Sequence, residues 1–334
     1  MFRFIVRRLL QLVPTLFGLT LLLFVWLHRL PGGPETSILG ERGTPALRAR
    51  IRHDMGLDQP LWVQYGKFMK RLLSGDLGTS VSTHRPVTTE FLERFPGTVE
   101  LTALAMTIAI GVGIPLGYYA ARRAGTARDH VSVGVSLLGI CTPVFFLGYI
   151  YKQIFAVNLG WFPTSGRQDV TIDATRITGF FVLDGLLTRE WDAAADAFMH
   201  LVLPALTLAS IPLAVIMRIT RASVLEVTQE DFVRTAESKG LTNRVIRGRH
   251  IMRNAMLPVA TTIGLLTGSL LSGAVLTETV FAFNGIGAFL VTSIDNRDYP
   301  VLMGFILMIA IVYLLINLIV DVSYTFIDPR VRVR

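Results

Sequence analysis

Ionisable residues in or beside apolar segments are the first candidates for chemistry in this chain of 334 residues. Glu100, Glu278 and Asp321 lie near the ends of long apolar runs, and Lys152 lies late in another. Acids near the middle of a membrane are typical of proton-coupled or sodium-coupled carriers. Because these residues lie near the ends instead, the pattern argues against secondary transport without excluding it. Glu278 would either line a path near the outer mouth or act as a structural partner for a neighbouring helix.

Motifs for catalysis are missing from the sequence. It contains no GxxxxGK[ST] phosphate-binding loop, no GxSxG or HExxH motif, and no pair of histidines four residues apart. The one cysteine, Cys141, can form no internal disulfide and is predicted to be a small buried hydrophobic residue. We therefore predict that this chain has no catalytic residue, binds no metal and holds no cofactor of its own.

A strongly basic segment, Gln229 to Pro258, lies between two apolar runs and has the pattern of two polar helices. Phe232 and Ala236 are spaced to share one face of the first helix. Gly240 suits the left-handed position that ends a helix, and a second helix is predicted to begin after Thr242. A short, structured segment between membrane spans favours recognition by a partner over mere connection.

Composition sets the class of the protein. Hydrophobic residues make up 51% of the chain and charged residues 17%, and the mean hydropathy is positive, as in an integral membrane protein. Six apolar runs are long enough to cross the hydrocarbon core as helices, and they lack the alternation that a β-barrel needs. The predicted fold class is therefore all-α, with six transmembrane helices. The runs centre on Leu9 to Leu27, Leu101 to Ala121, Val131 to Phe155, Leu201 to Met217, Val259 to Phe281 and Val301 to Val320.

The distribution of arginine and lysine predicts the orientation. Residues 218–256 carry eight basic and four acidic residues, whereas residues 158–199 carry three basic and six acidic. By the positive-inside rule both termini would lie in the cytoplasm, with the chain crossing the membrane several times. Residues 31–98 carry nine basic and seven acidic residues on the predicted outer side, where a loop this long crosses regardless of charge. The net charge of +8 thus reflects topology and does not indicate nucleic-acid binding.

The N-terminal apolar run is predicted to be a retained span, because it is longer than a signal-peptide core and no small-x-small cleavage site follows it. The loop after it should hold two amphipathic helices, one opening at Thr44 and Pro45 and ending near Gly56, the other opening at Asp58. They would form a small cap or docking surface, or simply cover the bundle. The chain is predicted to divide into the first span at 1–30, the outer loop at 31–97, the transmembrane core at 98–326 and the cytoplasmic tail at 327–334. The core would hold a coupling loop at 228–257. Its spans would lie at about 101–121, 131–155, 201–217, 259–281 and 301–320.

Small residues and prolines occur within the predicted spans. Ala109, Gly113 and Gly117 form a small-xxx-small face that lets helices approach closely. Prolines are expected to kink or break helices where neighbours or a water-filled cavity satisfy the freed carbonyls. These prolines are Pro115, Pro143, Pro204 and Pro212.

Several fragments, in order along nearly the whole chain, resemble one family. They are FRFIVRRLLQLVPTLFGLTLLLF, MGLDQPLWVQYGKF, SGDLGTSV with RPVTTEFLERFPGTVELT, VRTAESKGLTNRVIRGRHIMRNAMLP, TETVFAFNGIGAFLVTSIDNRDYPVLMG and INLIVDVSYTFIDPRVR. Together they are similar to the permease subunits of dipeptide and oligopeptide ABC importers, and most similar to the first permease of the pair. The fourth fragment resembles the cytoplasmic "EAA" loop of such permeases.

The resemblance implies an ABC type I importer fold, a place in the plasma (inner) membrane of a bacterium, and a set of partners. A second, homologous permease would complete the translocation path, two cytoplasmic ATPase subunits would bind ATP and Mg²⁺, and an extracytoplasmic binding protein would deliver di- or oligopeptides. Members of the same family carry other cargo, so nickel complexes, glutathione and sugars stay open as alternatives. A channel or secondary carrier, and a membrane-bound scaffold or receptor, are the rivals from other classes.

The resemblance also implies which residues meet the ATPase. The family's Glu-Ala-Ala positions fall on Arg234, Thr235 and Ala236, followed by the matching Gly240, and Arg234 replaces the acid. The predicted coupling residues are Phe232, Arg234, Thr235, Ala236 and Gly240 in the first helix and its end, with Arg249, His250 and Asn254 in support. The predicted residues of the outer mouth or path are Glu278, Asn284 and Asp298.

Overall fold

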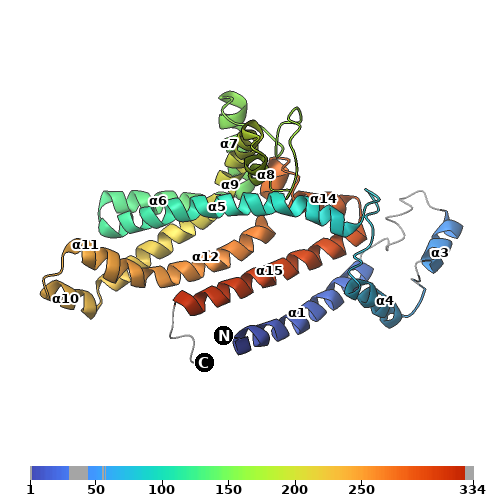
Figure 1. The fold of residues 1–334 in the computed structure, drawn as a ribbon, viewed down its shortest axis with the longest axis horizontal. Helices are drawn as coiled ribbons and strands as arrows, with labels where there is room; N and C mark the ends of the chain where they lie inside the picture. The colour runs from blue at the N-terminus through green and yellow to red at the C-terminus, as the bar shows by residue number, and fades with distance from the viewer. Residues whose placement is uncertain (1, 30–43, 55, 57, 328–334) are drawn as a thin grey trace. The chain divides into compact units, whose positions relative to one another are not determined.

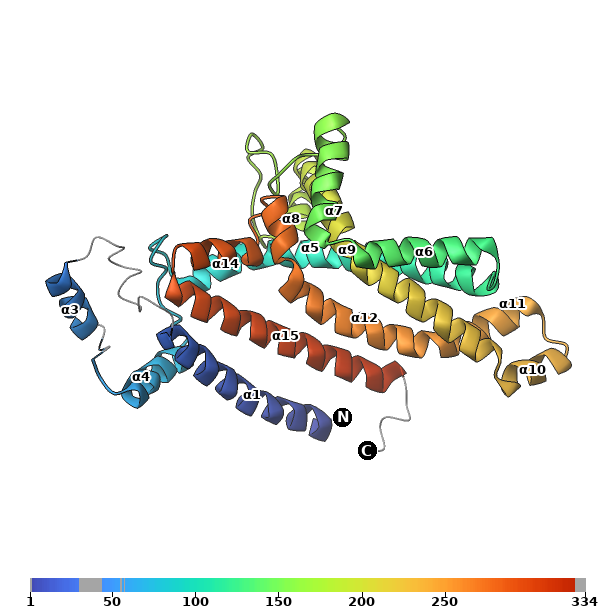
Figure 2. The same ribbon diagram turned by 180° about the vertical axis from the view of Figure 1, so that it is seen from behind.

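The protein is helical throughout the part that the structure describes. The computed structural model describes residues 2–29, 44–54, 56 and 58–327, where one isolated bridge between Thr79 and Pro86 is the sole β pairing (Figures 1 and 2). The chain divides into two compact units, one of residues 1–96 with 285–318 and the other of residues 97–284 with 319–334. The all-α class predicted from the apolar runs agrees with this structure.

Four helices are long and apolar enough to cross a membrane, among the residues described. They correspond to the first, second, fourth and sixth predicted spans. Their apolar parts are Val6–Arg29 in α1 (Phe2–Arg29), all of α5 (Val87–Arg122), all of α9 (Trp191–Thr228) and Tyr299–Ile319 in α15 (Tyr299–Ile327).

The third predicted span, 131–155, is divided. It consists of α6 (Ala127–Cys141), α7 (Val144–Tyr151) and the π-helix η2 (Lys152–Asn158), and α7 leaves the direction of α6 in both views (Figures 1 and 2). Pro143 caps α7, where its fixed φ suits a helix start and its missing N–H prevents α6 from continuing. Cys141 at the end of α6 is exposed, so the prediction that it is buried is wrong.

The fifth predicted span, 259–281, is also built from shorter pieces. The π-helix η3 (Ile246–Met252) leads into α12 (Arg253–Gly273), and α13 (Val275–Val280) follows. Prolines alone do not decide where helices break, because Pro204 and Pro212 lie inside α9 without ending it. Among the residues described, four of the predicted spans are thus single long apolar helices, and the count of six stays a prediction.

The first unit contains the two helices expected after α1. They are α3 (Pro45–Asp54) and α4 (Leu61–Leu73), and Gly56 has φ +67°, in the left-handed region where a glycine is favoured. Asp58 does not open α4, which begins three residues later, and its carboxylate contacts the His53 ring at 2.8 Å.

Aromatic side chains fasten α4 to α1 in this unit. The ring of Phe24 packs against Tyr65 and Phe68, and the hydroxyl groups of Thr20 and Tyr65 lie 2.9 Å apart. A separate apolar cluster joins the start of α5 to α14 (Ile286–Asp295) and α15. Its buried members are Val87, Phe91, Ile286, Val301 and Phe305.

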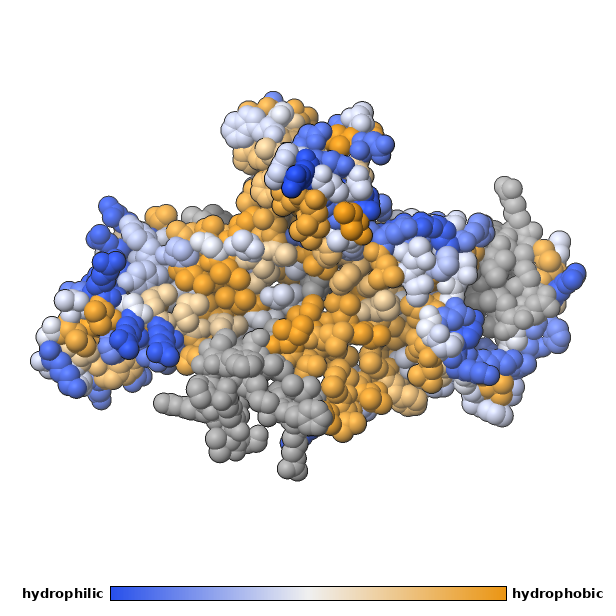
Figure 3. Space-filling view, viewed as in Figure 1, coloured by the Kyte–Doolittle hydropathy of each residue, from blue (hydrophilic) through white to orange (hydrophobic). Residues whose placement is uncertain are grey.

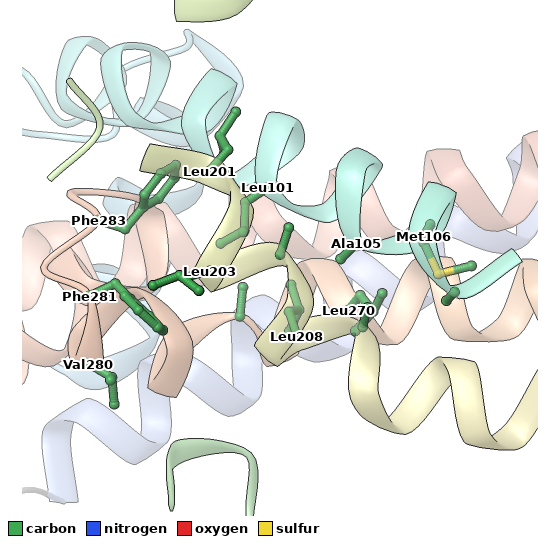
Figure 4. Packing of buried hydrophobic residues seen from close by; sticks show 14 of the residues in the cluster. Leu101, Ala105, Met106, Leu201, Leu203, Leu208, Leu270, Val280, Phe281 and Phe283 are labelled. Carbon is green, nitrogen blue, oxygen red and sulfur yellow. The ribbon is translucent and has the colours of Figure 1, made fainter. Parts of the chain in front are cut away.

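In the second unit α9 is the central helix. It contacts α6, α7, α8 (Phe181–Thr188), α12 and α13, and it supplies much of the main apolar core (Figure 4). Leu101 of α5, Leu203 of α9 and Phe281 after α13 are all buried there. The small face of α5 packs as predicted, since a Cβ atom on Gly113 would lie 3.1 Å from the carbonyl oxygen of Leu213.

Candidate functional site

The basic segment between α9 and α12 forms two short helices, as its sequence predicts. These are α10 (Asp231–Ser238) and α11 (Asn243–Val245), the second starting directly after Thr242. Gly240 has φ +74°, and its N–H donates to the carbonyl oxygen of Glu237 at 2.9 Å. Together with a bond from Leu241 to Ala236, this is the Schellman arrangement that closes a helix.

One face of α10 is anchored in an apolar cluster, here named the coupling cluster. Val233 and Ala236, three residues apart on α10, are 2% and 5% exposed. Phe232, four residues before Ala236 and therefore on a neighbouring part of the helix surface as predicted, is 40% exposed and lies at the open edge of the anchored face. The coupling cluster consists of Ala121 of α5, Val224 of α9, Val233 and Ala236 of α10, Ile246 and Ile251 of η3, and Ala255 of α12.

The opposite face of α10 is open. Arg234 and Thr235 are exposed there, and Arg234 makes a loose ion pair with Asp231 at 3.7 Å in which both side chains are solvated. A solvated pair of this kind contributes little to stability. In Figure 3 hydrophilic residues gather over α10 and α11, in contrast to the more hydrophobic surface beside them. A rigidly seated helix with a free polar face is suited to docking against another protein.

The predicted supporting residues lie in the continuation of this segment. Arg249 and His250 belong to η3, where Arg249 is exposed and His250 partly buried. Asn254 is exposed in the first turn of α12, and its side-chain amide donates to the carbonyl oxygen of His250 at 2.7 Å. The supporting residues therefore neighbour one another along one helical stretch. Their role in coupling stays a prediction.

Two of the three predicted path residues belong to the second unit. Glu278, on α13, is fully buried and accepts a hydrogen bond of 2.6 Å from the hydroxyl of Thr98 on α5. Asn284 follows α13 and is exposed. The Glu278 contact is the one expected of a structural partner between helices, while a role for either residue in lining a path stays a prediction.

Asp298 belongs to the first unit, where it is fully buried just before α15. It accepts hydrogen bonds from the hydroxyl of Ser80 at 2.6 Å and from the hydroxyl and N–H of Ser82 at 2.8 and 3.1 Å. Burial raises the pKa of Asp298, but these bonds outweigh burial and hold the pKa below its ordinary value. Asp298 thus fixes the turn at Ser80 to the start of α15, and path lining by this residue also stays a prediction.

Sequence reasoning missed a buried ion pair in the loop between η2 and α8. The guanidinium of Arg167 donates to Glu100 at 3.1 Å and to the carbonyl oxygen of Gly179 at 2.9 Å, and it stacks on Phe181 at 3.7 Å. Gly97 makes room for this guanidinium, since a Cβ atom there would lie 2.7 Å from its central carbon. The local sequence carries no signal that joins Arg167 to an acid 67 positions away.

Long apolar helices, a packed apolar core and a polar helical pair that exposes one face define a multi-span membrane protein. The chain belongs to the family of inner membrane components of binding-protein-dependent transport systems. The family model covers residues 113–333, and the model of the family's N-terminal part covers residues 1–102. The resemblance found in the sequence fragments is confirmed.

Relatives match over nearly the full length. The di/tripeptide transport system permease protein DppB of Pseudomonas aeruginosa (strain UCBPP-PA14) is 46% identical over 99% of both chains. The dipeptide transport system permease protein DppB of Escherichia coli (strain K12) is 44% identical, again over 99% of both. The glutathione transport system permease protein GsiC of Salmonella choleraesuis (strain SC-B67) is 38% identical over 99% of both. A crystal structure of an amino acid ABC transporter matches 73% of this chain at 15% identity with a TM-score of 0.47.

Proposed function

We propose that this chain is one of the two permease subunits of an ATP-driven importer of di- or oligopeptides. Peptide cargo is supported by the names of its full-length relatives, among which the dipeptide and di/tripeptide permeases at 44% and 46% identity are more similar than the glutathione permease at 38%. An extracytoplasmic binding protein would deliver the peptide. A second, homologous permease would form the other half of the path, with both termini of this chain in the cytoplasm.

The observation that carries the mechanism is the seating of α10. Val233 and Ala236 hold this helix in the coupling cluster with residues of α5, α9, η3 and α12, so it can move only together with those elements. Its free face, with Phe232, Arg234 and Thr235, would lie in a groove of a cytoplasmic ATPase subunit. ATP and Mg²⁺ would bind to the ATPases alone, and their closure would displace α10 as a rigid lever and switch the permease pair between outward-open and inward-open states.

The test is transport by the assembled complex. This chain, its partner permease, the ATPase subunits and the binding protein are reconstituted in vesicles and supplied with radiolabelled dialanine. We expect uptake to require ATP and the binding protein and to be abolished by an ATPase unable to hydrolyse ATP. Accumulation of dialanine without ATP would replace this proposal with a carrier or a channel. ATP-dependent uptake of nickel complexes or sugars, with none of peptide, would retain the permease and overturn its cargo.

A further inference from the structure

A buried ion pair joins α6 to α9 in the half of α9 that leads to α10. The guanidinium of Arg221 donates from Nε to one carboxylate oxygen of Asp129 at 2.6 Å and from Nη2 to the other at 2.7 Å. The N–H of Gly125, in the turn before α6, donates to the same carboxylate at 3.0 Å. The Asp129 side chain is 4% exposed and that of Arg221 28%. A bidentate pair of this kind fixes orientation as well as distance.

The pair lies beside a close crossing of α5 and α9. A Cβ atom on Gly117 would meet the carbonyl oxygen of Met217 and would lie 2.7 Å from the Cβ of Thr220, so the two backbones touch there. Thr220 is fully buried and precedes Arg221 directly. Helices α5, α6 and α9 are thus fastened to one another about two turns before α9 ends at Thr228.

Two different kinds of contact therefore lead from α10 through α9 to α6. The coupling cluster joins α10 to α5 and α9 through apolar side chains, and its buried members, among the residues described, include none from α6. The Asp129–Arg221 pair adds α6 to the same assembly. Beyond the break at Pro143, α7 packs on α13, where a Cβ atom on Gly148 would lie 3.3 Å from a methyl carbon of Val280. The chain of contacts thus reaches from α10 to the helix that carries Glu278.

We propose that Asp129 and Arg221 are a positioning pair that transmits the displacement of α10 through α9 to α6 and α7. This inference rests on the proposed function, because it needs α10 to be moved by an ATPase. Without the pair, α10 and α9 would still move with the ATPase, but α6 would not follow in register. ATP hydrolysis would then proceed with less movement of peptide.

The measurement is the number of dialanine molecules imported per ATP hydrolysed in vesicles that contain the complete complex. For Asp129→Asn and Arg221→Gln we expect this ratio to fall about tenfold while the subunits still assemble, a coupling loss of ordinary allosteric size. The charge exchange Asp129→Arg with Arg221→Asp should recover a substantial part of the ratio. Arg218→Gln, an exposed arginine about one turn earlier on α9, is the matched control and should keep the wild-type ratio.

The number of dialanine molecules imported per ATP hydrolysed distinguishes a positioning role of the pair from a merely structural one. A pair that merely stabilises the fold would lower uptake and hydrolysis together and leave their ratio unchanged, which would overturn the inference. If both single variants fail to assemble, Arg221→Lys keeps the charge but not the planar two-point contact, and a wild-type ratio for that variant would also overturn it. Absence of ATP-dependent uptake by the wild-type complex would instead reject the proposed function, whatever the variants do.

Discussion

The backbone N–H of Leu241 donates a hydrogen bond of 3.3 Å to the carbonyl oxygen of Ala236, and this bond closes α10 over a left-handed Gly240. Gly240, which ends the helix, and Ala236, which anchors it, therefore belong to the same Schellman motif. Any substitution that prevents φ near +74° at Gly240 should release the end of α10.

Gly240→Pro should uncouple ATP hydrolysis from uptake. Proline requires φ near −65° and removes the N–H that donates to Glu237, so the closing turn cannot form. Gly240→Ala, which meets no atom within 4 Å, should cost only about 1 kcal/mol of local conformational energy and retain most uptake. The measurement is imported dialanine per ATP in vesicles, with Gly248→Ala, at an open position without positive φ, as the control. Full coupling in Gly240→Pro would contradict this account of α10.

Ala236→Asp should have a similar effect for a different reason. Ala236 is 5% exposed within the coupling cluster, and a carboxylate there would lie among apolar side chains. We expect α10 to detach from the coupling cluster and peptide uptake to be lost, while the complex still inserts into the membrane. Ser238→Asp adds the same charge at an exposed position of the same helix and serves as the control. Equal uptake by the two variants would show that burial at Ala236 is unimportant.

Glu278 provides a test of a structural contact against a path residue. Glu278→Gln keeps an oxygen that can accept the hydrogen bond from Thr98, whereas Thr98→Val removes the donor and leaves the acid buried. If the contact is structural, Thr98→Val should lower the thermal stability of the complex by about 1–3 kcal/mol, and Glu278→Gln by less. Thermal unfolding, monitored by size-exclusion chromatography, measures which of the two variants loses more stability. Loss of uptake in Glu278→Gln with unchanged stability would favour a role in the path.

Gly97→Ala should destabilise the second unit. Its new methyl group would crowd the Arg167 guanidinium, which would have to shift within its contacts with Glu100 and Phe181. Weakening the hydrogen bonds of this charged pair should cost about 1–3 kcal/mol. Gly111→Ala, a helical glycine on the same α5 with open space around it, should be neutral or stabilising, because alanine favours helix. Thermal unfolding of the two variants compares them directly, and equal midpoints would refute the close fit at Gly97.

The Asp129–Arg221 pair should not respond to pH in the physiological range. The hydrogen-bonded Arg221 guanidinium lowers the pKa of Asp129 to about 2, against the opposing effect of burial, with further lowering from the Gly125 N–H and from His130. An acid with a lowered pKa stabilises the fold fully above its unfolded value of 3.8, and this stabilisation is lost as the pH falls through about 2. The difference in thermal midpoint between wild type and Asp129→Asn should therefore stay constant from about pH 8 to about pH 5. A difference that shrinks within that range would mean that the carboxylate titrates there.

The sequence by itself determined the class of this protein and where some of its helices begin and end. Apolar runs, their charge asymmetry and the ordered motifs indicated a helical membrane permease, and Gly240 and Thr242 marked the end of α10 and the start of α11. These features could be predicted because hydrophobic length and capping are properties of neighbouring residues.

Only the tertiary structure decided which residues act together. Helix packing buried Val233 and Ala236 as the anchoring face of α10 and left Phe232 exposed. It also divided the third apolar run at Pro143, whereas α9 continues through Pro204. It also paired polar groups far apart in the chain: Asp129 with Arg221, Thr98 with Glu278, and Ser80 with Asp298. Periodicity states which residues share a face of one helix, but the partner of that face, and so the burial of each charge, is set by how distant helices pack.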